Sequence, residues 1–209
     1  LLGVYNSSSE IDFKALPQKF VLKCTHGCGC NIICTNKDEL NQEMARQQLD
    51  AWLKIDYSKS AGELHYASMK PRIICEEFLD NLDGKQPTDF KVFCFNGKAN
   101  CVFVATDRDP HGHTDKYDFY DFNWNKLPYY KSSLNADREI PKPASFCEII
   151  EIAETLSKPF PFVRMDFYNI KGKAILGEMT FTPSGCMSND FTDLAQQTFG
   201  SLLVLPKPV

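Results

Sequence analysis

Short apolar segments separated by tight-turn signals constrain the fold of this chain. Asn96-Gly97 lies between two such segments, and both residues tolerate the positive φ angles that a two-residue hairpin loop requires. A second pair of segments flanks residues 169–173, and a third pair flanks the loop that contains Gly27 and Gly29. Paired segments of this kind predict antiparallel sheet. The predicted strands span residues 20–24, 31–34, 72–79, 90–95, 100–106, 117–122, 163–168 and 174–181.

Helices are indicated by two capping-box patterns, in which Asn or Ser is followed three residues later by Glu. Apolar residues recur at helical spacing after each pattern. The predicted helices lie within residues 36–54, 145–158 and 190–203, and residues 57–70 are predicted to be loop with some helix. The chain is therefore expected to be α+β with mainly antiparallel sheet, and 209 residues suffice for one domain or two small lobes.

Composition excludes several classes of partner. The formal charge is −4 and no long basic run occurs, which argues against nucleic acid as a partner. No apolar run approaches the ~20 residues of a membrane-spanning helix. Nine cysteines, most of them inside apolar segments, are typical of reduced thiols and favour a cytoplasmic location. Because the chain opens on Leu1 without a leader pattern, we expect a preceding N-terminal region to lie outside it.

The segment KCTHGCGCNIIC, residues 23–34, could be a zinc site, a redox centre or a phosphate loop. Its cysteines follow C-x3-C, C-x-C and C-x3-C spacings, with no paired knuckle elsewhere to complete a zinc shell. Lys23 instead lies on a predicted strand shortly before Gly27 and Gly29. A lysine offers a point charge to phosphate oxygens, and glycines let backbone N–H groups approach them. The favoured interpretation is therefore a phosphate loop.

A second candidate site lies near the C-terminus. Arg164 and Asp166 share one face of a predicted strand, and a hairpin partner brings Glu178 beside Asp166. Two adjacent carboxylates on buried strands are costly unless a cation lies between them, and magnesium favours such oxygen ligands. The alternative is a solvated hairpin face with an Arg–Asp pair.

The ordered motifs FVLKCTHGCG, IICEEFL, DFKVFCFNGK, VRMDFYN and GEMTFTPSG resemble the ATP-grasp superfamily, and most closely its TupA-like family. The resemblance implies an ATP-grasp fold in which two α+β lobes enclose ATP. We expect the smaller lobe at residues 1–78 and the larger at residues 79–209.

The resemblance also implies roles for single residues. Lys23 and Lys91 would contact ATP phosphates, and Arg164 would act with Lys91 in catalysis. The implied nucleotide-binding residues are Lys23, His26, Gly27, Gly29, Glu76, Glu77, Phe78, Leu79, Lys91 and Arg108. The implied metal-binding residues are Asp166, Glu178 and Thr180. Thr180 stands where the family usually has asparagine, and its hydroxyl is a poorer ligand. His111 and His113 could bind a metal with neighbouring aspartates, but a loop beside the active site is favoured.

The activity that the resemblance implies is amide formation driven by ATP. MgATP would phosphorylate a carboxylate, and an amine would attack the acyl phosphate, with Mn²⁺ as an alternative ion. The acceptor would be a small or glycan-linked carboxylate of cell-surface polysaccharide synthesis, with a functional link to glycosyltransferases. Two alternatives remain: a kinase acting on a sugar hydroxyl, and a non-catalytic nucleotide-binding partner of a glycosyltransferase.

Overall fold

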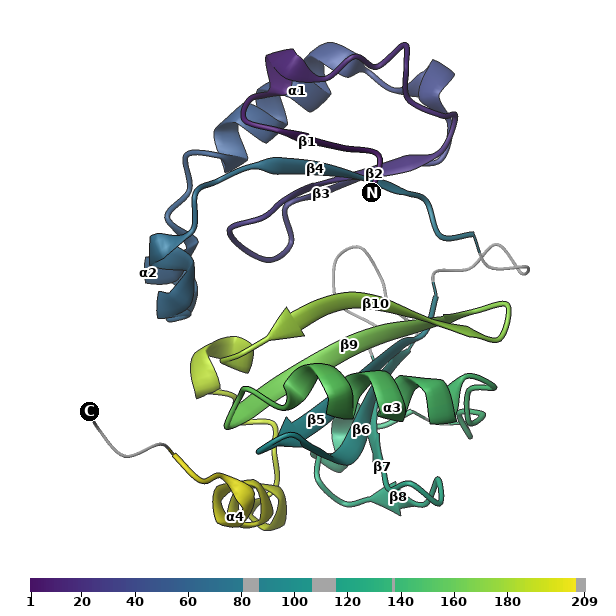
Figure 1. The fold of residues 1–209 in the computed structure, drawn as a ribbon, viewed down its shortest axis with the longest axis vertical. Coiled ribbons are helices and arrows are strands. Elements are labelled where there is room, and N and C mark those ends of the chain that lie inside the picture. The colour runs from purple at the N-terminus through teal and green to yellow at the C-terminus, as the bar shows by residue number, and fades with distance from the viewer. Residues whose placement is uncertain (81–86, 107–115, 137, 206–209) are drawn as a thin grey trace. The chain divides into compact units, whose positions relative to one another are not determined.

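The chain folds into two compact units, Leu1–Leu79 and Asp80–Val209. Figure 1 shows them in a computed structural model, which describes residues 1–80, 87–106, 116–136 and 138–205. Each unit combines antiparallel sheet with helices, so the predicted α+β class is confirmed. Within the described ranges, no helix has the length and apolar character needed to cross a membrane.

Unit 1 is built on a four-stranded antiparallel sheet in the order β1-β4-β2-β3, with α1 on one face (Figure 1). Alternation along β2 buries Phe20, Leu22 and Cys24 against Leu49 of α1, and turns Lys23 to the opposite face. The elements of this unit are β1 (Gly3–Tyr5), η1 (Ser8–Glu10), β2 (Phe20–Cys24), β3 (Asn31–Cys34), η2 (Lys37–Glu39), α1 (Gln42–Trp52), α2 (Tyr57–Ala61), η3 (Leu64–Ser68) and β4 (Ile73–Glu77).

The prediction of the first helix is wrong at its start, because α1 begins at Gln42 and not at the predicted cap Asn36. Asn36 and Glu39 do not form the reciprocal capping box. The side chain of Asn36 instead accepts from the N–H of Asp38 at 3.1 Å and donates to Oε1 of Glu39 at 2.7 Å, and the residues enclose only the 3-10 turn η2. The backbone becomes extended at Leu40 (φ −71°, ψ 120°), which ends that turn. α1 then starts afresh at its own cap, where the side chain of Asn41 accepts a hydrogen bond from the N–H of Met44 at 3.0 Å.

Unit 2 is built on a six-stranded antiparallel sheet in the order β10-β9-β5-β6-β7-β8. The Asn96-Gly97 turn joins β5 to β6 with φ angles of 50° and 77°, as the sequence predicts. The elements are β5 (Asp89–Phe95), β6 (Lys98–Thr106), β7 (Lys116–Tyr120), β8 (Lys126–Leu127), η4 (Ser132–Leu134), α3 (Phe146–Ser157), β9 (Phe162–Ile170), β10 (Lys173–Thr180), η5 (Pro183–Cys186) and α4 (Asp193–Leu202).

The two faces of this sheet are covered differently. α3 packs on one face, where Val92, Met165 and Ile149 are fully or almost fully buried. On the other face an aromatic cluster around Phe93 includes Phe199 of α4, whose ring stacks on that of Phe93 with centroids 5.2 Å apart. The same face carries the polar side chains of the C-terminal candidate site.

Candidate functional site

The register between β9 and β10 shifts by one residue at Gly177, which is the extra residue of a β-bulge. Beyond the bulge, Glu178 pairs with Asp166. Without the bulge Glu178 would pair with Met165, which is fully buried beneath α3. The bulge therefore brings Glu178 to the face that carries Asp166. A Cβ atom at residue 177 would lie 3.0 Å from the ring of Tyr168, so glycine fits this position best.

Lys91 lies at the centre of the charged cluster on this face. Its Nζ is 2.5 Å from Oδ2 of Asp89 and 2.5 Å from Oδ2 of Asp166. The side chains of both aspartates are 4% exposed, and that of Lys91 is 11% exposed. Buried charges are tolerated when they are paired in this way. The ammonium group of Lys91 is therefore a cation beside Asp166 that the protein itself supplies.

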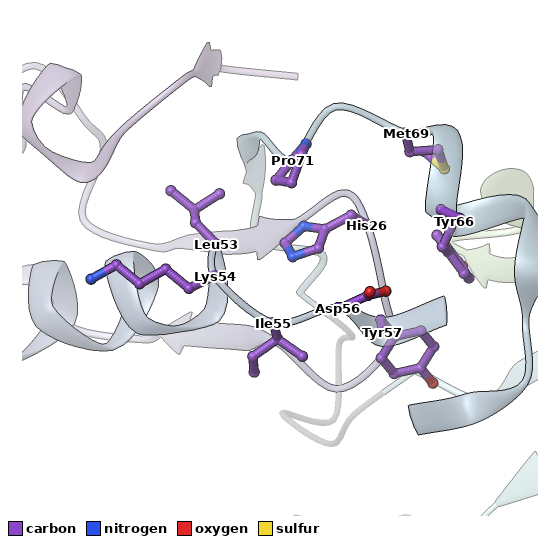
Figure 2. A pocket seen from close by; sticks show the side chains of 10 residues that line it. His26, Leu53, Lys54, Ile55, Asp56, Tyr57, Tyr66, Met69 and Pro71 are labelled. Atoms are coloured by element: carbon purple, nitrogen blue, oxygen red, sulfur yellow. The ribbon is translucent and has the colours of Figure 1, made fainter. Parts of the chain in front are cut away.

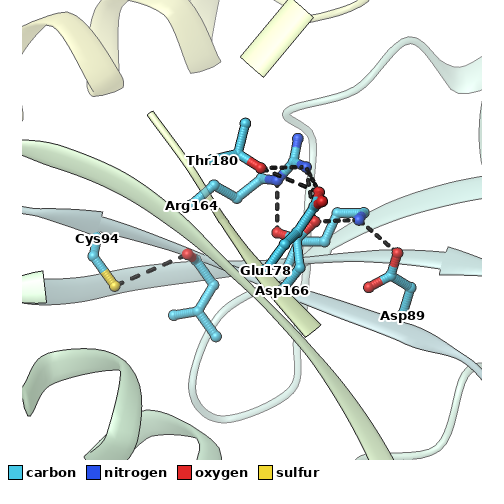
Figure 3. Close-up of polar contacts among 8 residues, drawn as sticks. Asp89, Cys94, Arg164, Asp166, Glu178 and Thr180 are labelled. Atoms are coloured by element: carbon cyan, nitrogen blue, oxygen red, sulfur yellow. Dashed lines mark hydrogen bonds and ion pairs between the residues drawn. The ribbon is translucent and has the colours of Figure 1, made fainter. Parts of the chain in front are cut away.

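Arg164 completes the set. Its Nε and Nη2 donate to the two oxygens of Asp166, each at 2.7 Å, which is a bidentate arrangement. Nη2 also lies 3.4 Å from Oε1 of Glu178 and donates to the hydroxyl of Thr180 at 3.1 Å. That hydroxyl in turn donates to Oε1 of Glu178 at 3.2 Å. Thr180 therefore connects Arg164 to Glu178 and fixes the position of the outer carboxylate (Figure 3).

The two paired carboxylates differ electrostatically. Burial opposes ionisation of Asp166, but Lys91 and Arg164 outweigh it and lower the pKa of this carboxyl group. Partial burial and the neighbouring Asp166 raise the pKa of Glu178. The side chain of Glu178 is nevertheless 56% exposed. Its negative charge is the less compensated of the two and is open to an added cation.

Asp166 and Glu178 fit a magnesium ion by the chemistry of their oxygens. Magnesium is commonly held by one or two carboxylates plus substrate phosphates. Across the described part of the chain, no group of three or more His, Cys, Asp and Glu side chains is arranged to hold a metal. A metal at this pair would thus depend on ligands such as phosphate, and it would compete with Lys91 and Arg164 for Asp166.

The candidate phosphate contacts of unit 1 lie on the face of the sheet opposite α1. Nζ of Lys23 on β2 forms an ion pair with Oε2 of Glu76 on β4 at 2.6 Å, and both side chains are about one-third exposed. Glu77 is exposed on β4, and Phe78 follows it with Lys19 Nζ 5.6 Å from the ring centroid. The family resemblance assigned both Lys23 and Glu76 to nucleotide binding, but the sequence analysis did not predict their ion pair.

The loop between β2 and β3 is shaped by its two glycines. Gly29 has φ +78°, a conformation that favours glycine. A Cβ atom at Gly27 would lie 2.7 Å from the ring of Tyr57, so only glycine lets the loop approach α2 this closely. His26 is buried, and its Nε2 lies 3.1 Å from the carbonyl oxygen of Trp52. Its ring thus points into unit 1, towards a pocket drawn in Figure 2.

The cysteines of the loop region differ in environment. Cys24 and Cys34 are buried in the core of unit 1, whereas Cys28 is exposed and Cys30 is half-buried. Burial raises the pKa of Cys24 to about 12, so this thiol stays protonated at neutral pH. Two of the four thiols therefore serve as small apolar side chains.

Some of the predicted site residues are not part of the sites described above, and one residue of the charged cluster was not predicted. Arg108, His111 and His113 lie outside the described residues. Leu79 is half-buried at the end of unit 1. Asp89 was missed, although it stands two residues before Lys91 and so shares its face of the strand. The DFK motif contains both Asp89 and Lys91, so their shared face could have been predicted from it.

Comparison with known proteins decides the family. The model of the family described as TupA-like ATPgrasp matches residues 1–204. The chain belongs to the TupA-like ATP-grasp family. This membership confirms the predicted family and, with the two antiparallel sheets, the predicted ATP-grasp fold class. No curated protein matches the chain.

Solved structures similar to this TupA-like protein include ATP-grasp ligases. D-alanine–D-alanine ligase from Bacillus anthracis matches with 16% identity and a TM-score of 0.49, over 92% of this chain and 53% of that one. The ATP-grasp ligase PsnB in complex with a minimal precursor matches with 12% identity and a TM-score of 0.48, over 96% and 53%. The chain thus spans about half the length of the structures that it matches.

Proposed function

We propose that this chain is the ATP-binding part of an ATP- and magnesium-dependent ligase, which joins a carboxylate to an amine and releases ADP and phosphate. The observation that carries the proposal is the cluster of Lys91, Arg164, Asp166 and Glu178 on one face of the unit 2 sheet. It combines two cations with an exposed, incompletely compensated carboxylate. By the family resemblance, we infer an acceptor carboxylate from cell-surface polysaccharide synthesis.

The chemistry asked of these residues is mostly positioning and charge stabilisation. An acceptor carboxylate oxygen would attack the γ-phosphorus, and the bond from that phosphorus to the oxygen of ADP would break. The amine would then attack the acyl carbon, releasing phosphate and a proton. Lys91 and Arg164 would stabilise charge on the transferring group, and Lys23 would hold phosphate oxygens. Magnesium, held by Asp166 and Glu178, would supply further neutralisation of phosphate charge.

The proposal is tested by incubating the full-length protein with ATP, magnesium and a panel of carboxylates and amines. We expect ADP release that needs both co-substrates, and a product whose mass is that of the amide. A phosphorylated hydroxyl would instead support the kinase alternative, and ATP that binds but is never consumed would support the non-catalytic one. Glu178→Gln should be strongly impaired, whereas Glu151→Gln, at an exposed position on α3, should match the parent.

Replacing Thr180 by valine should weaken the response to magnesium. Valine keeps the shape of threonine but removes the hydroxyl that links Arg164 to Glu178. Loss of such a hydrogen bond is worth about 0.5–1.5 kcal/mol, so the magnesium concentration for half-maximal ADP release should rise up to about tenfold. Thr198→Val is the matched control, because that hydroxyl only bonds a carbonyl within α4. An unchanged magnesium response would remove Thr180 from the site.

Lowering the pH should also weaken the response to magnesium. The pKa of Glu178 is raised above its ordinary value of 4.5, so Glu178 gains a proton at a higher pH than an ordinary glutamate does. A protonated carboxyl group loses its attraction for a cation. We expect the half-saturating magnesium concentration to rise as the pH falls through this raised pKa, and Glu178→Gln to abolish that dependence. The same pH profile in the variant would contradict the assignment of Glu178.

A further inference from the structure

Asp89 is a buried carboxylate of the unit 2 sheet to which the proposed reaction gives no role. It lies on β5 two residues before Lys91, and its side chain is 4% exposed. Nζ of Lys91 is 2.5 Å from Oδ2 of Asp89 and equally close to Oδ2 of Asp166. A lysine ammonium has three N–H donors, so it can contact both aspartates and still offer a donor to a further acceptor. Lys91 therefore has two carboxylate partners, of which the proposed metal site uses one.

The sheet keeps Asp89 apart from the proposed metal ligands. β9 lies between β5 and β10, and the register places Asp166 between Lys91 on β5 and Glu178 on β10. Asp89 instead lies opposite Tyr168, two residues along β9 from Asp166. In the described ranges, no three His, Cys, Asp or Glu side chains are arranged to hold a metal, so Asp89 does not join Asp166 and Glu178 as a ligand. The contact that links Asp89 to this site is its ion pair with Lys91.

This ion pair matters because Lys91 and an added cation compete for Asp166. If Lys91 left Asp166, that carboxylate would keep Arg164, which donates to both of its oxygens at 2.7 Å. The ammonium would keep Asp89. Breaking a buried ion pair is costly when it leaves a buried charge uncompensated, and neither charge would be left so here. With asparagine at position 89, the same movement would take the ammonium from its remaining aspartate.

We propose that Asp89 is a positioning residue, which holds the Lys91 ammonium at the site when a divalent cation binds Asp166. Asp89 thereby weakens the competition of Lys91 for Asp166 and keeps the ammonium beside the phosphate that it is proposed to contact. The inference rests on the proposed function, because it takes Asp166 and Glu178 to hold magnesium together with a nucleotide.

The test measures ADP binding to the full chain by isothermal titration calorimetry over a series of magnesium concentrations, so that no turnover is needed. For Asp89→Asn, the half-saturating magnesium concentration should rise at least about tenfold, as expected from one hydrogen bond to a charged group. An unchanged magnesium response would overturn the proposal. So would a loss of ADP affinity that is equal with and without magnesium, because it would assign Asp89 to the fold alone. ADP binding by the parent that does not respond to magnesium would refute the metal site of the proposed function, and the role of Asp89 with it.

Asp118→Asn is the matched control for the loss of a buried aspartate. The side chain of Asp118 on β7 of the same sheet is 2% exposed, and its Oδ2 lies 3.0 Å from Nζ of Lys126. This variant should respond to magnesium as the parent does. Asp89→Glu keeps a carboxylate within reach of the flexible lysine and should restore the parent response. A response as weak as that of Asp89→Asn would contradict the proposal.

A comparison in the Lys91→Met background separates positioning from a direct effect of charge. Lys91→Met and the double variant Asp89→Asn/Lys91→Met should need the same magnesium concentration for ADP binding, because no lysine is left for Asp89 to hold. A weaker magnesium response in the double variant would mean that Asp89 acts on the cation through its own charge, which would overturn the proposal. Urea unfolding checks that each variant is folded. Asp89→Asn and Asp89→Glu retain the lysine, so they decide the proposal even if Lys91→Met does not fold.

Discussion

Replacing Lys91 by methionine is expected to abolish turnover and to destabilise the protein strongly. The substitution leaves Asp89 and Asp166 buried without the ammonium that lies 2.5 Å from both. Removing one partner of a buried ion pair typically costs about 3–5 kcal/mol, a large share of the ~5–15 kcal/mol by which domains are stable. Turnover should fall at least about 10²–10³-fold, as it does when one group that stabilises transition-state charge is lost. Urea unfolding and ADP release measure the two effects.

A double variant separates the two consequences of this change. Asp89→Asn together with Lys91→Met removes one of the two carboxylates that lose the ammonium, and so should recover part of the lost stability. It should remain inactive, because the proposed phosphate contact is still missing. Lys98→Met is the control for removing a lysine from the same sheet: it is 79% exposed and 3.5 Å from Glu154, so its effect should stay within about 1 kcal/mol. Full activity in the double variant would exclude Lys91 from the chemistry.

Replacing Asp166 by asparagine should remove activity at least as completely, with a smaller loss of stability. Lys91 keeps Asp89, and Arg164 keeps its contacts with Thr180 and Glu178, so no cation is left alone. We expect a loss of about 1–3 kcal/mol at pH 7. The pKa of Asp166 is lowered in the fold, so its stabilising effect is present above the ordinary value of 3.8 and disappears as the pH falls through the lowered pKa.

The measurement for Asp166 is therefore a comparison of unfolding free energies across pH. Parent and variant should differ most above pH 3.8 and converge in stronger acid. A difference that stays constant with pH would mean that the carboxylate charge is not what stabilises the fold. Activity retained by the variant would remove Asp166 from the proposed metal site.

The sheets could be predicted because their signals are local. Period-two alternation and turn residues lie within a few positions of one another, and the two hairpins predicted at Asn96-Gly97 and at residues 169–173 both formed. The same alternation correctly put Arg164 and Asp166 side by side. Local signals failed at the start of α1, because Asn36 caps a short 3-10 turn through the N–H of Asp38 and does not start the helix.

The electrostatics of the site could not be predicted in the same way. The ion pair of Lys91 with Asp166 joins residues 75 positions apart, and it exists only because β5 and β9 are neighbours in the sheet. The sequence order gives no indication of that adjacency. Likewise, the inward turn of His26 depends on the carbonyl of Trp52, which a long-range packing contact provides. The sequence shows which residues carry charge, but it does not show which charges neutralise one another.

The bulge at Gly177 divides β10 into two halves with opposite parity. Ala174 and Leu176 share the face of the sheet that α3 covers, whereas Met179 takes that face after the bulge. Even-numbered positions therefore lie on the α3 side of the sheet before the glycine, and odd-numbered ones after it. A substitution at Ala174 therefore changes packing against α3 but does not change the face on which Glu178 lies. A one-residue deletion at the bulge would couple the two halves and exchange a carboxylate for a core methionine.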